Sequence, residues 1–270
     1  MRSLLKFFLL TFIASWTFWI AAATITGRAA SLPSGLATIG VLLYLLGVFA
    51  PALVGLALTA QADGRPGTMA LLSRIVRLPT AARWYVFAVG YFAAIKLGVA
   101  LVHRMATGAW PPFSQTPFYI MLVAIVLSTP VQAGEEIGWR GYALPRLARQ
   151  LGLARASIVL GVIWACWHLP FFLIPGTDKS GQSFPVYLLG VTALSVAMAW
   201  LYWSTNGSLL LTMLMHAAVN NTNIVPSAGS PATNPFSLSA PLVAWLTAAL
   251  LWIGAVYFLV RMRGVRVSEQ

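Results

Sequence analysis

Glu135 and Glu136 stand side by side in a chain that has only five acidic residues. They follow the apolar run PFYIMLVAIVLSTPVQAG, so we expect them at or inside the boundary of a membrane helix. An acidic side chain at the centre of a bilayer costs roughly 2.5–3.5 kcal/mol on insertion scales, and it is usually paired or hydrated. A functional site is therefore the first hypothesis for this pair.

Arg140 lies four residues after Glu136, with the acid on the N-terminal side, which is the favourable order for an ion pair along a helix. Adjacent helical residues point about 100° apart, so the two carboxylates cannot face one partner equally. We therefore expect Arg140 to neutralise Glu136 and to leave Glu135 free to face a cavity. The alternative is that all three charges simply end a helix at its cytosolic boundary.

Two histidines lie in other apolar stretches. His168 is deep within VIWACWHLPFFL, and His216 stands four residues before Asn220 in LLLTMLMHAAVNNTN. That spacing places His216 and Asn220 on one helix face, where they could hold a water molecule or a developing oxyanion. The alternative for each residue is a structural hydrogen bond, which is common for His and Asn in membranes.

A carboxylate and two imidazoles on three different helices suggest hydrolytic chemistry. Converging in a hydrated pocket, they could activate a water molecule. Glu135, His168 and His216 could also hold a divalent metal, because one carboxylate with two histidines is a known catalytic zinc set. The chain has no H-E-x-x-H pair, so its motifs do not require zinc or any other cofactor.

The composition defines the environment of these residues. Hydrophobic residues make up 59% of the chain, charged residues 8%, and the mean hydropathy is +0.82. Soluble domains carry about 25% charged residues, so this is an integral membrane protein whose surroundings are a lipid bilayer. The net charge of +12 would suggest nucleic acid in a soluble chain. Here the basic residues lie between apolar stretches, and we expect no nucleic-acid partner.

Eight apolar stretches approach the ~20 residues that span a bilayer. They cover approximately residues 4–26, 36–59, 84–103, 117–136, 155–174, 185–203, 207–224 and 240–261. We predict an all-α polytopic membrane protein with about eight transmembrane helices around an intramembrane cavity. Residues 1–270 should form a single domain with a motif-bearing core at about 117–224. The first stretch is too long for the hydrophobic part of a signal peptide, so we interpret it as a retained helix.

The basic residues predict an orientation, because positively charged loops stay in the cytosol. One side of the membrane receives Arg2, Lys6, Arg65, Arg74, Arg77, Arg83, Arg140, Arg146, Arg149, Arg155, Arg261, Arg263 and Arg266. The other side receives only Arg28, Arg104 and Lys179. We therefore expect both termini in the cytosol, and we favour the plasma membrane of a bacterium.

One difficulty concerns the depth of Glu135. At about 1.5 Å per residue, Glu135 falls close to the cytosolic boundary of its stretch, whereas both histidines lie deeper. Convergence of the three side chains requires a tilted helix, a kink near Pro130, or a fourth helix that starts deeper in the membrane.

The three motifs resemble those of the CPBP family, which includes the type II CAAX prenyl endopeptidases and the bacteriocin-immunity (Abi) proteins. The E-E-x-x-x-R motif matches Glu135, Glu136 and Arg140 within EEIGWRGYALPRL. An aromatic-x-x-x-H motif matches Trp164 and His168, with Trp where Phe is usual. The H-x-x-x-N motif matches His216 and Asn220.

The resemblance implies an eight-helix membrane endopeptidase whose site lies in a cavity reached from the cytosolic side. It implies that Glu135 and His168 activate the attacking water, and that His216 and Asn220 stabilise the oxyanion. Glu136 and Arg140 would support the site. The substrate would be a membrane-associated or lipidated protein or peptide, and metal assistance stays open.

Two other functions fit parts of the sequence. A non-catalytic member could bind a peptide or toxin and confer immunity, although such a protein would not need the carboxylate and both histidines. A proton-coupled transporter would also use intramembrane Glu and His residues. The absence of a detectable inverted repeat disfavours the transporter.

Overall fold

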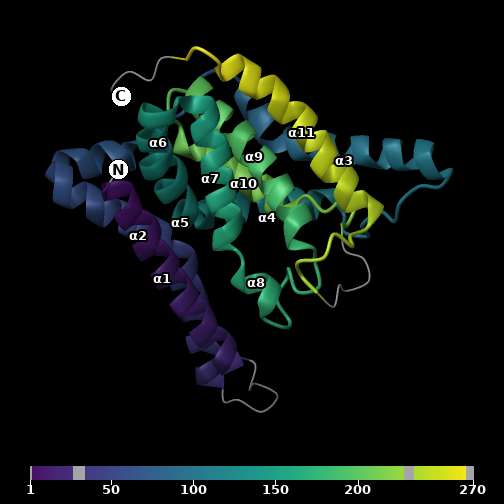
Figure 1. Cartoon of the computed structure of the whole chain (residues 1–270), viewed down its shortest axis with the longest axis horizontal. Coiled ribbons are helices and arrows are strands. Elements are labelled where there is room, and N and C mark those ends of the chain that lie inside the picture. The colour runs from purple at the N-terminus through teal and green to yellow at the C-terminus, as the bar shows by residue number, and fades with distance from the viewer. Residues whose placement is uncertain (1, 27–33, 228–233, 266–270) are drawn as a thin grey trace.

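The computed structural model describes residues 2–26, 34–227 and 234–265. Regular structure in these ranges is helical (Figure 1). Seven helical stretches of the described residues are long and apolar enough to cross a membrane, and Leu209–Asn221 is a shorter apolar helix. The prediction of an all-α polytopic membrane protein is confirmed.

The long helices are α1 (Arg2–Thr26), α2 (Ser34–Ser73), α3 (Arg83–Thr107), α4 (Phe118–Ser128), α7 (Leu153–Trp167), α9 (Phe184–Ser204), α10 (Leu209–Asn221) and α11 (Leu242–Met262). Shorter elements are η2 (Arg74–Val76), η3 (Thr129–Gln132), α5 (Ala133–Glu136), η4 (Ile137–Ala143), α6 (Leu144–Leu151) and α8 (Pro170–Leu173). The helices α1, α3, α9 and α11 match the predicted apolar stretches closely.

The second helix continues well past its predicted end at residue 59. It runs to Ser73, with one break at Gly64, whose φ of 63° lies in the left-handed region that glycine adopts without penalty. Pro66 follows shortly after, where a new helical turn tolerates its missing N–H. The helix therefore continues through residues 60–73, beyond the apolar stretch predicted over 36–59.

The fourth helix also extends beyond its predicted end at residue 136. The helical stretch Phe118–Leu151 contains 34 residues, with a 3₁₀ turn (η3) around Pro130 and a π-helical segment (η4) after Glu136. Glu135 consequently lies near the middle of this stretch rather than at its end. The 3₁₀ turn near Pro130 and the continuation of the helical stretch to Leu151 remove the difficulty over depth.

Close approaches of backbones hold the central helices together. A Cβ built on Gly138 would lie 2.5 Å from the carbonyl of Pro51, so α2 packs directly on the π-helical segment. A Cβ on Gly161 would lie 2.8 Å from the Cα of Thr192, which brings α7 equally close to α9. Small residues at helix interfaces permit such contacts in membranes. These two contacts place the motif-bearing helices in the core of the molecule.

Candidate active site

Glu136 is the more constrained of the two adjacent carboxylates. Arg140 Nη1 donates to Glu136 Oε1 at 2.9 Å, and both side chains are completely buried. His216 Nδ1 lies 2.9 Å from the same oxygen. The predicted ion pair is therefore present, but it lies in the core rather than in a cytosolic loop. Arg140 is therefore not one of the cytosolic loop residues whose positive charges predict the orientation.

Glu135 is also buried, but it is less constrained than its neighbour. Its Oε2 accepts a hydrogen bond of 2.7 Å from the indole Nε1 of Trp164 on α7. Within the described part of the chain, no hydrogen bond involves its other oxygen, Oε1. One carboxylate oxygen is thus oriented by the protein, and the other is available to a water molecule or a substrate.

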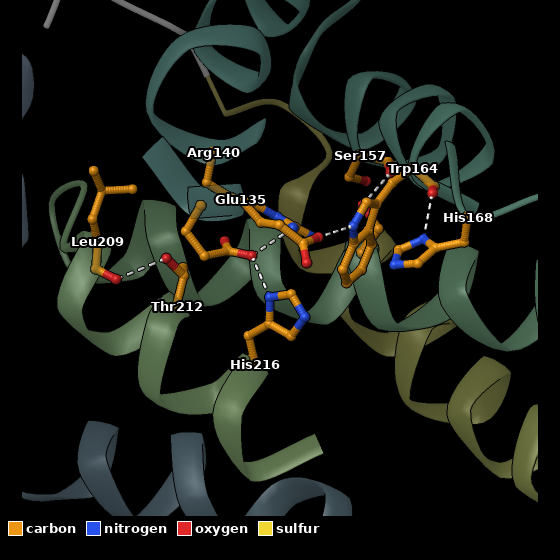
Figure 2. Close-up of polar contacts among 10 residues, drawn as sticks. Glu135, Arg140, Ser157, Trp164, His168, Leu209, Thr212 and His216 are labelled. Carbon is orange, nitrogen blue, oxygen red and sulfur yellow. Dashed lines mark hydrogen bonds and ion pairs between the residues drawn. The ribbon is translucent and has the colours of Figure 1, made fainter. Parts of the chain in front are cut away.

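His168 is anchored through the backbone of the same tryptophan. Its Nδ1 lies 2.8 Å from the carbonyl oxygen of Trp164, one turn earlier. A carbonyl can only accept, so Nδ1 carries the proton and Nε2 is left with a free lone pair. Figure 2 shows that Trp164 lies between Glu135 and His168 and connects to both. The carboxylate and this imidazole are therefore positioned by one residue.

His216 reaches the cluster from α10. Its ring meets the Trp164 ring edge to face, with 5.2 Å between the ring centroids. Because Nδ1 donates to the ionised Glu136 carboxylate, Nε2 is again the free ring nitrogen. Figure 2 shows His216 and His168 on different sides of the Trp164 indole. Side chains from the three motif-bearing segments therefore contact Trp164.

Arg140 stabilises the cluster in a second way. Its guanidinium carbon lies 4.2 Å from the centroid of the Trp164 ring, and guanidinium groups stack favourably on aromatic faces. Its Nε and Nη2 have no hydrogen-bond partner among the described residues. An incompletely satisfied buried cation is costly, and the aromatic face offsets part of that cost.

Asn220 lies apart from these contacts. It follows His216 by one turn of α10, as predicted, but its side chain is exposed. The neighbouring Asn221 is the amide that pairs with another helix, donating to Ser128 Oγ at 2.8 Å. The role of Asn220 toward an oxyanion stays a prediction.

The π-helical segment η4 explains how Glu136 and Arg140 are presented to the core. All seven residues from Ile137 to Ala143 are buried. Single π-helical turns inside α-helices occur frequently at functional sites, because they change the direction of the side chains that follow. The sequence carried no signal for this segment, except for the two small residues Gly138 and Gly141.

The proposed metal ligands do not form a metal site in this arrangement. Among the described residues, no three His, Cys, Asp or Glu side chains are close enough to hold an ion together. Glu135, His168 and His216 therefore do not fit a three-ligand metal centre, and we assign no step to a metal.

Trp164 is the functional residue that the sequence motifs understated. It matched the motif only as an aromatic side chain, yet its N–H group provides the hydrogen bond to Glu135. In the sequence, this donor was indicated only by a Trp at the motif position where Phe is usual. Lys96 on α3 is buried; it donates to Ser227 Oγ at 2.6 Å and to Thr247 Oγ1 on α11 at 3.4 Å.

Fold and site together define an integral membrane protein with a buried carboxylate–imidazole cluster. Residues 115–222 match the family model of the type II CAAX prenyl endopeptidases, Rce1-like. The chain is also 24% identical over 230 residues to a protein named CAAX prenyl protease 2 from Methanococcus maripaludis, over 79% of this chain and 81% of that protein. Both comparisons support the predicted resemblance to the CPBP family, which includes the type II CAAX prenyl endopeptidases.

Proposed function

We propose that this protein hydrolyses a peptide bond in a membrane-associated or lipidated peptide or protein. Glu135 and His168 activate the attacking water, and His216, with Asn220 beside it, stabilises the oxyanion. The observation that carries this proposal is the unequal treatment of the two carboxylates. Glu136 Oε1 is held by both Arg140 and His216 and its Oε2 is buried, whereas Glu135 is held only through Oε2, and no hydrogen bond among the described residues involves its Oε1.

The free atoms suggest how the reaction proceeds. A water molecule between Glu135 Oε1 and His168 Nε2 would donate one hydrogen bond to each acceptor. As its oxygen attacks the carbonyl carbon of the substrate, Glu135 takes a proton and a tetrahedral oxyanion forms. Glu135 then returns the proton to the amide nitrogen, and the C–N bond breaks to give a carboxylate and an amine. General bases positioned in this way contribute typically 10²–10⁴-fold to the rate.

Trp164 and Glu136 support the two reacting groups. The Trp164 indole fixes Glu135, and its carbonyl fixes the tautomer of His168. Glu136 orients the His216 ring so that Nε2 is its free atom. When this ring is protonated, Nε2–H donates to the oxyanion, a contribution that preorganised donors make in many hydrolases.

The name of the archaeal relative suggests a prenylated protein as one substrate. A hydrophobic peptide without a lipid is the other substrate to test. The runner-up function, non-catalytic peptide binding or immunity, would use the same cavity without turnover. Cleavage therefore decides between these two functions.

The test is mass-spectrometric detection of cleavage by the purified protein in lipid nanodiscs, with one farnesylated peptide and a pool of unmodified hydrophobic peptides. Glu135→Gln should reduce cleavage at least 10²-fold without changing the melting temperature. Asp63→Asn, which removes an acid outside the cluster, is the matched control and should cleave like the wild type. Equal rates for Glu135→Gln and wild type would refute the proposed role of Glu135, and binding without cleavage by the wild type would favour the non-catalytic function.

A further inference from the structure

A cavity lined by charged residues lies between the end of α2, α6 and the end of α9. Its volume is about 260 Å³. Arg74 of η2 lines it together with Arg146 and Arg149 of α6, and Asp63 of α2 is the acid among its lining residues. Three positive charges and one negative charge give the lining a net charge of +2. We call this space the arginine cavity.

Asp63 neutralises little of the positive charge. Arg146 Nη2 lies 3.6 Å from Asp63 Oδ2, and the Asp63 side chain is 52% exposed. Ion pairs between solvent-exposed side chains contribute little, because water screens them. Arg146 Nη1 donates to the Tyr142 carbonyl at 3.1 Å, and the guanidinium carbon lies 3.8 Å from the centroid of the Tyr142 ring. Arg146 is therefore held in position by the preceding helical turn while its charge is only partly neutralised.

The other two arginines of the cavity have no acidic partner in the described part of the chain. Arg74 and Arg149 form no ion pair there. Arg74 donates to the Tyr202 hydroxyl, a neutral group, at 2.6 Å. Arg149 is exposed in the last turn of α6. Like charges around one cavity repel each other, so an anion bound between them would relieve this repulsion.

Guanidinium groups favour phosphate among the common biological anions. The planar fork of N–H donors matches the spacing of phosphate oxygens and often forms two parallel hydrogen bonds with them. The three arginines come from two segments, so they can approach one anion from different sides. A carboxylate has only two oxygens to share among three guanidinium groups, whereas a phosphate group has more. The lining therefore favours a phosphate-bearing ligand.

The arginine cavity lies at the ends of membrane helices. Arg74 directly follows the last residue of α2, Arg149 is in the last turn of α6, and Trp203 is the last residue but one of α9. In Figure 1, α6 lies in the same upper part of the view as the start of α1. Tryptophan is enriched at the membrane–water interface, and basic pockets between membrane helices bind lipid head groups. The bilayer itself therefore supplies phosphate groups at this depth.

We propose that the arginine cavity binds the phosphate group of an acidic phospholipid. Free phosphate offers the same oxygens, but the position at the helix ends favours a phosphate that the bilayer carries. The bound group bridges η2 and α6. These segments are already close, because the cavity reaches Gly141 of η4, where a Cβ would lie 2.7 Å from Leu71 of α2. Lipid binding therefore stabilises the packing of α2 on η4 and α6, whether or not the protein is a hydrolase.

Binding is tested by thermal unfolding of the purified protein in a neutral detergent, titrated with dioleoyl phosphatidylglycerol. A ligand that binds only the folded state raises the melting temperature with its concentration. The melting temperature of the wild type should rise and then saturate. Dioleoylglycerol, which has the same chains without phosphate, should not change it, and inorganic phosphate at the same concentration should raise it less. Equal stabilisation by dioleoylglycerol would overturn the proposal, and equal stabilisation by inorganic phosphate would overturn the assignment to a lipid.

The position of the site is tested with two arginine variants. Arg149→Gln removes an exposed cation of the cavity and should melt like the wild type without lipid. It should need about tenfold more phosphatidylglycerol for half of the maximal shift, because a hydrogen bond to a charged group is worth about one order of magnitude in affinity. Arg261→Gln removes an exposed cation in the last turn of α11 and should titrate like the wild type. An equal loss in both variants, or no shift in the wild type, would overturn the proposal.

Discussion

The inner and outer helices of this protein differ in how much of their surface is buried against other helices. In the stretch α7–α8 and in α9, 61% of the residues in the most apolar window are buried inside the protein, against 22% in α1 and α3. Trp164 and His168 lie on or at the end of α7, and the ion pair and His216 lie on the adjoining segments α5, η4 and α10; all are buried and have a protein partner. The outer helices expose large apolar side chains such as Leu5, Ile13 and Val86. Polar chemistry in this membrane protein is therefore confined to positions where other helices replace water.

The buried ion pair should give the largest effect on stability. Replacing Arg140 by Met leaves the Glu136 charge buried without its cation, and breaking such a pair costs about 3–5 kcal/mol. Thermal unfolding in detergent should show a markedly lower melting temperature and loss of activity.

The partly exposed Arg146–Asp63 pair provides the matched control. Both side chains are partly exposed, and the atoms are 3.6 Å apart. Surface pairs contribute about 0–1 kcal/mol, so Asp63→Asn should melt nearly like the wild type. Equal decreases in melting temperature for Arg140→Met and Asp63→Asn would contradict the inference that the buried pair contributes more to stability than the surface pair.

The contact between α2 and the π-helical segment should give an intermediate effect. In Gly138→Ala, the new methyl group would meet the Pro51 carbonyl at 2.5 Å, so the two helices must separate. Overpacking of this kind costs about 1–3 kcal/mol, and it should also disturb Glu136 and Arg140. Melting temperature and cleavage rate should both fall.

Gly90→Ala on the outer helix α3 is the control for that substitution. A Cβ at Gly90 meets no atom within 4 Å. Alanine is favoured over glycine in helices by up to about 1 kcal/mol, so this variant should be as stable as the wild type or slightly more stable. A destabilised Gly90→Ala with an unaffected Gly138→Ala would contradict the packing described here.

The hydrogen bond from Trp164 to Glu135 should give the smallest but most specific effect. Trp164→Phe keeps an aromatic ring but removes the donor 2.7 Å from Glu135 Oε2. Hydrogen bonds to charged groups contribute about 1.5–3 kcal/mol, so kcat should fall roughly 10–100-fold. KM and the melting temperature should change little.

Trp110→Phe, at an exposed position between α3 and α4, is the matched control. It should leave kcat, KM and the melting temperature unchanged. If Trp164→Phe lowered the melting temperature but not kcat, Trp164 would be a packing residue rather than a positioning residue for Glu135.

Much of the fold and of the site could be predicted from the sequence. Hydropathy located the membrane helices because each must satisfy its backbone within the bilayer, and helical spacing paired Glu136 with Arg140. Hydropathy also ended the predicted fourth helix at residue 136, because charged residues at that point mark the end of the apolar stretch. The buried pair and Gly138 allow that helix to continue to Leu151.

The remaining features depend on contacts between distant residues. The indole hydrogen bond joins residues 29 positions apart, and the contact from His216 to Glu136 joins residues 80 positions apart. No local pattern specifies these distances. The exposure of Asn220 likewise follows from how α10 is rotated among its neighbours, which the i, i+4 spacing alone cannot determine.

The central claim is that Glu135 takes the proton from the attacking water, whereas Glu136 holds Arg140 and His216 in place. The most direct measurement compares Glu135→Gln and Glu136→Gln for cleavage rate per folded molecule and for melting temperature, on the same peptide in the same nanodiscs. We predict that Glu135→Gln melts like the wild type and cleaves at least 10²-fold more slowly, whereas Glu136→Gln melts at a lower temperature. An active Glu135→Gln variant, or an inactive Glu136→Gln variant with unchanged melting, would contradict this division between the two carboxylates.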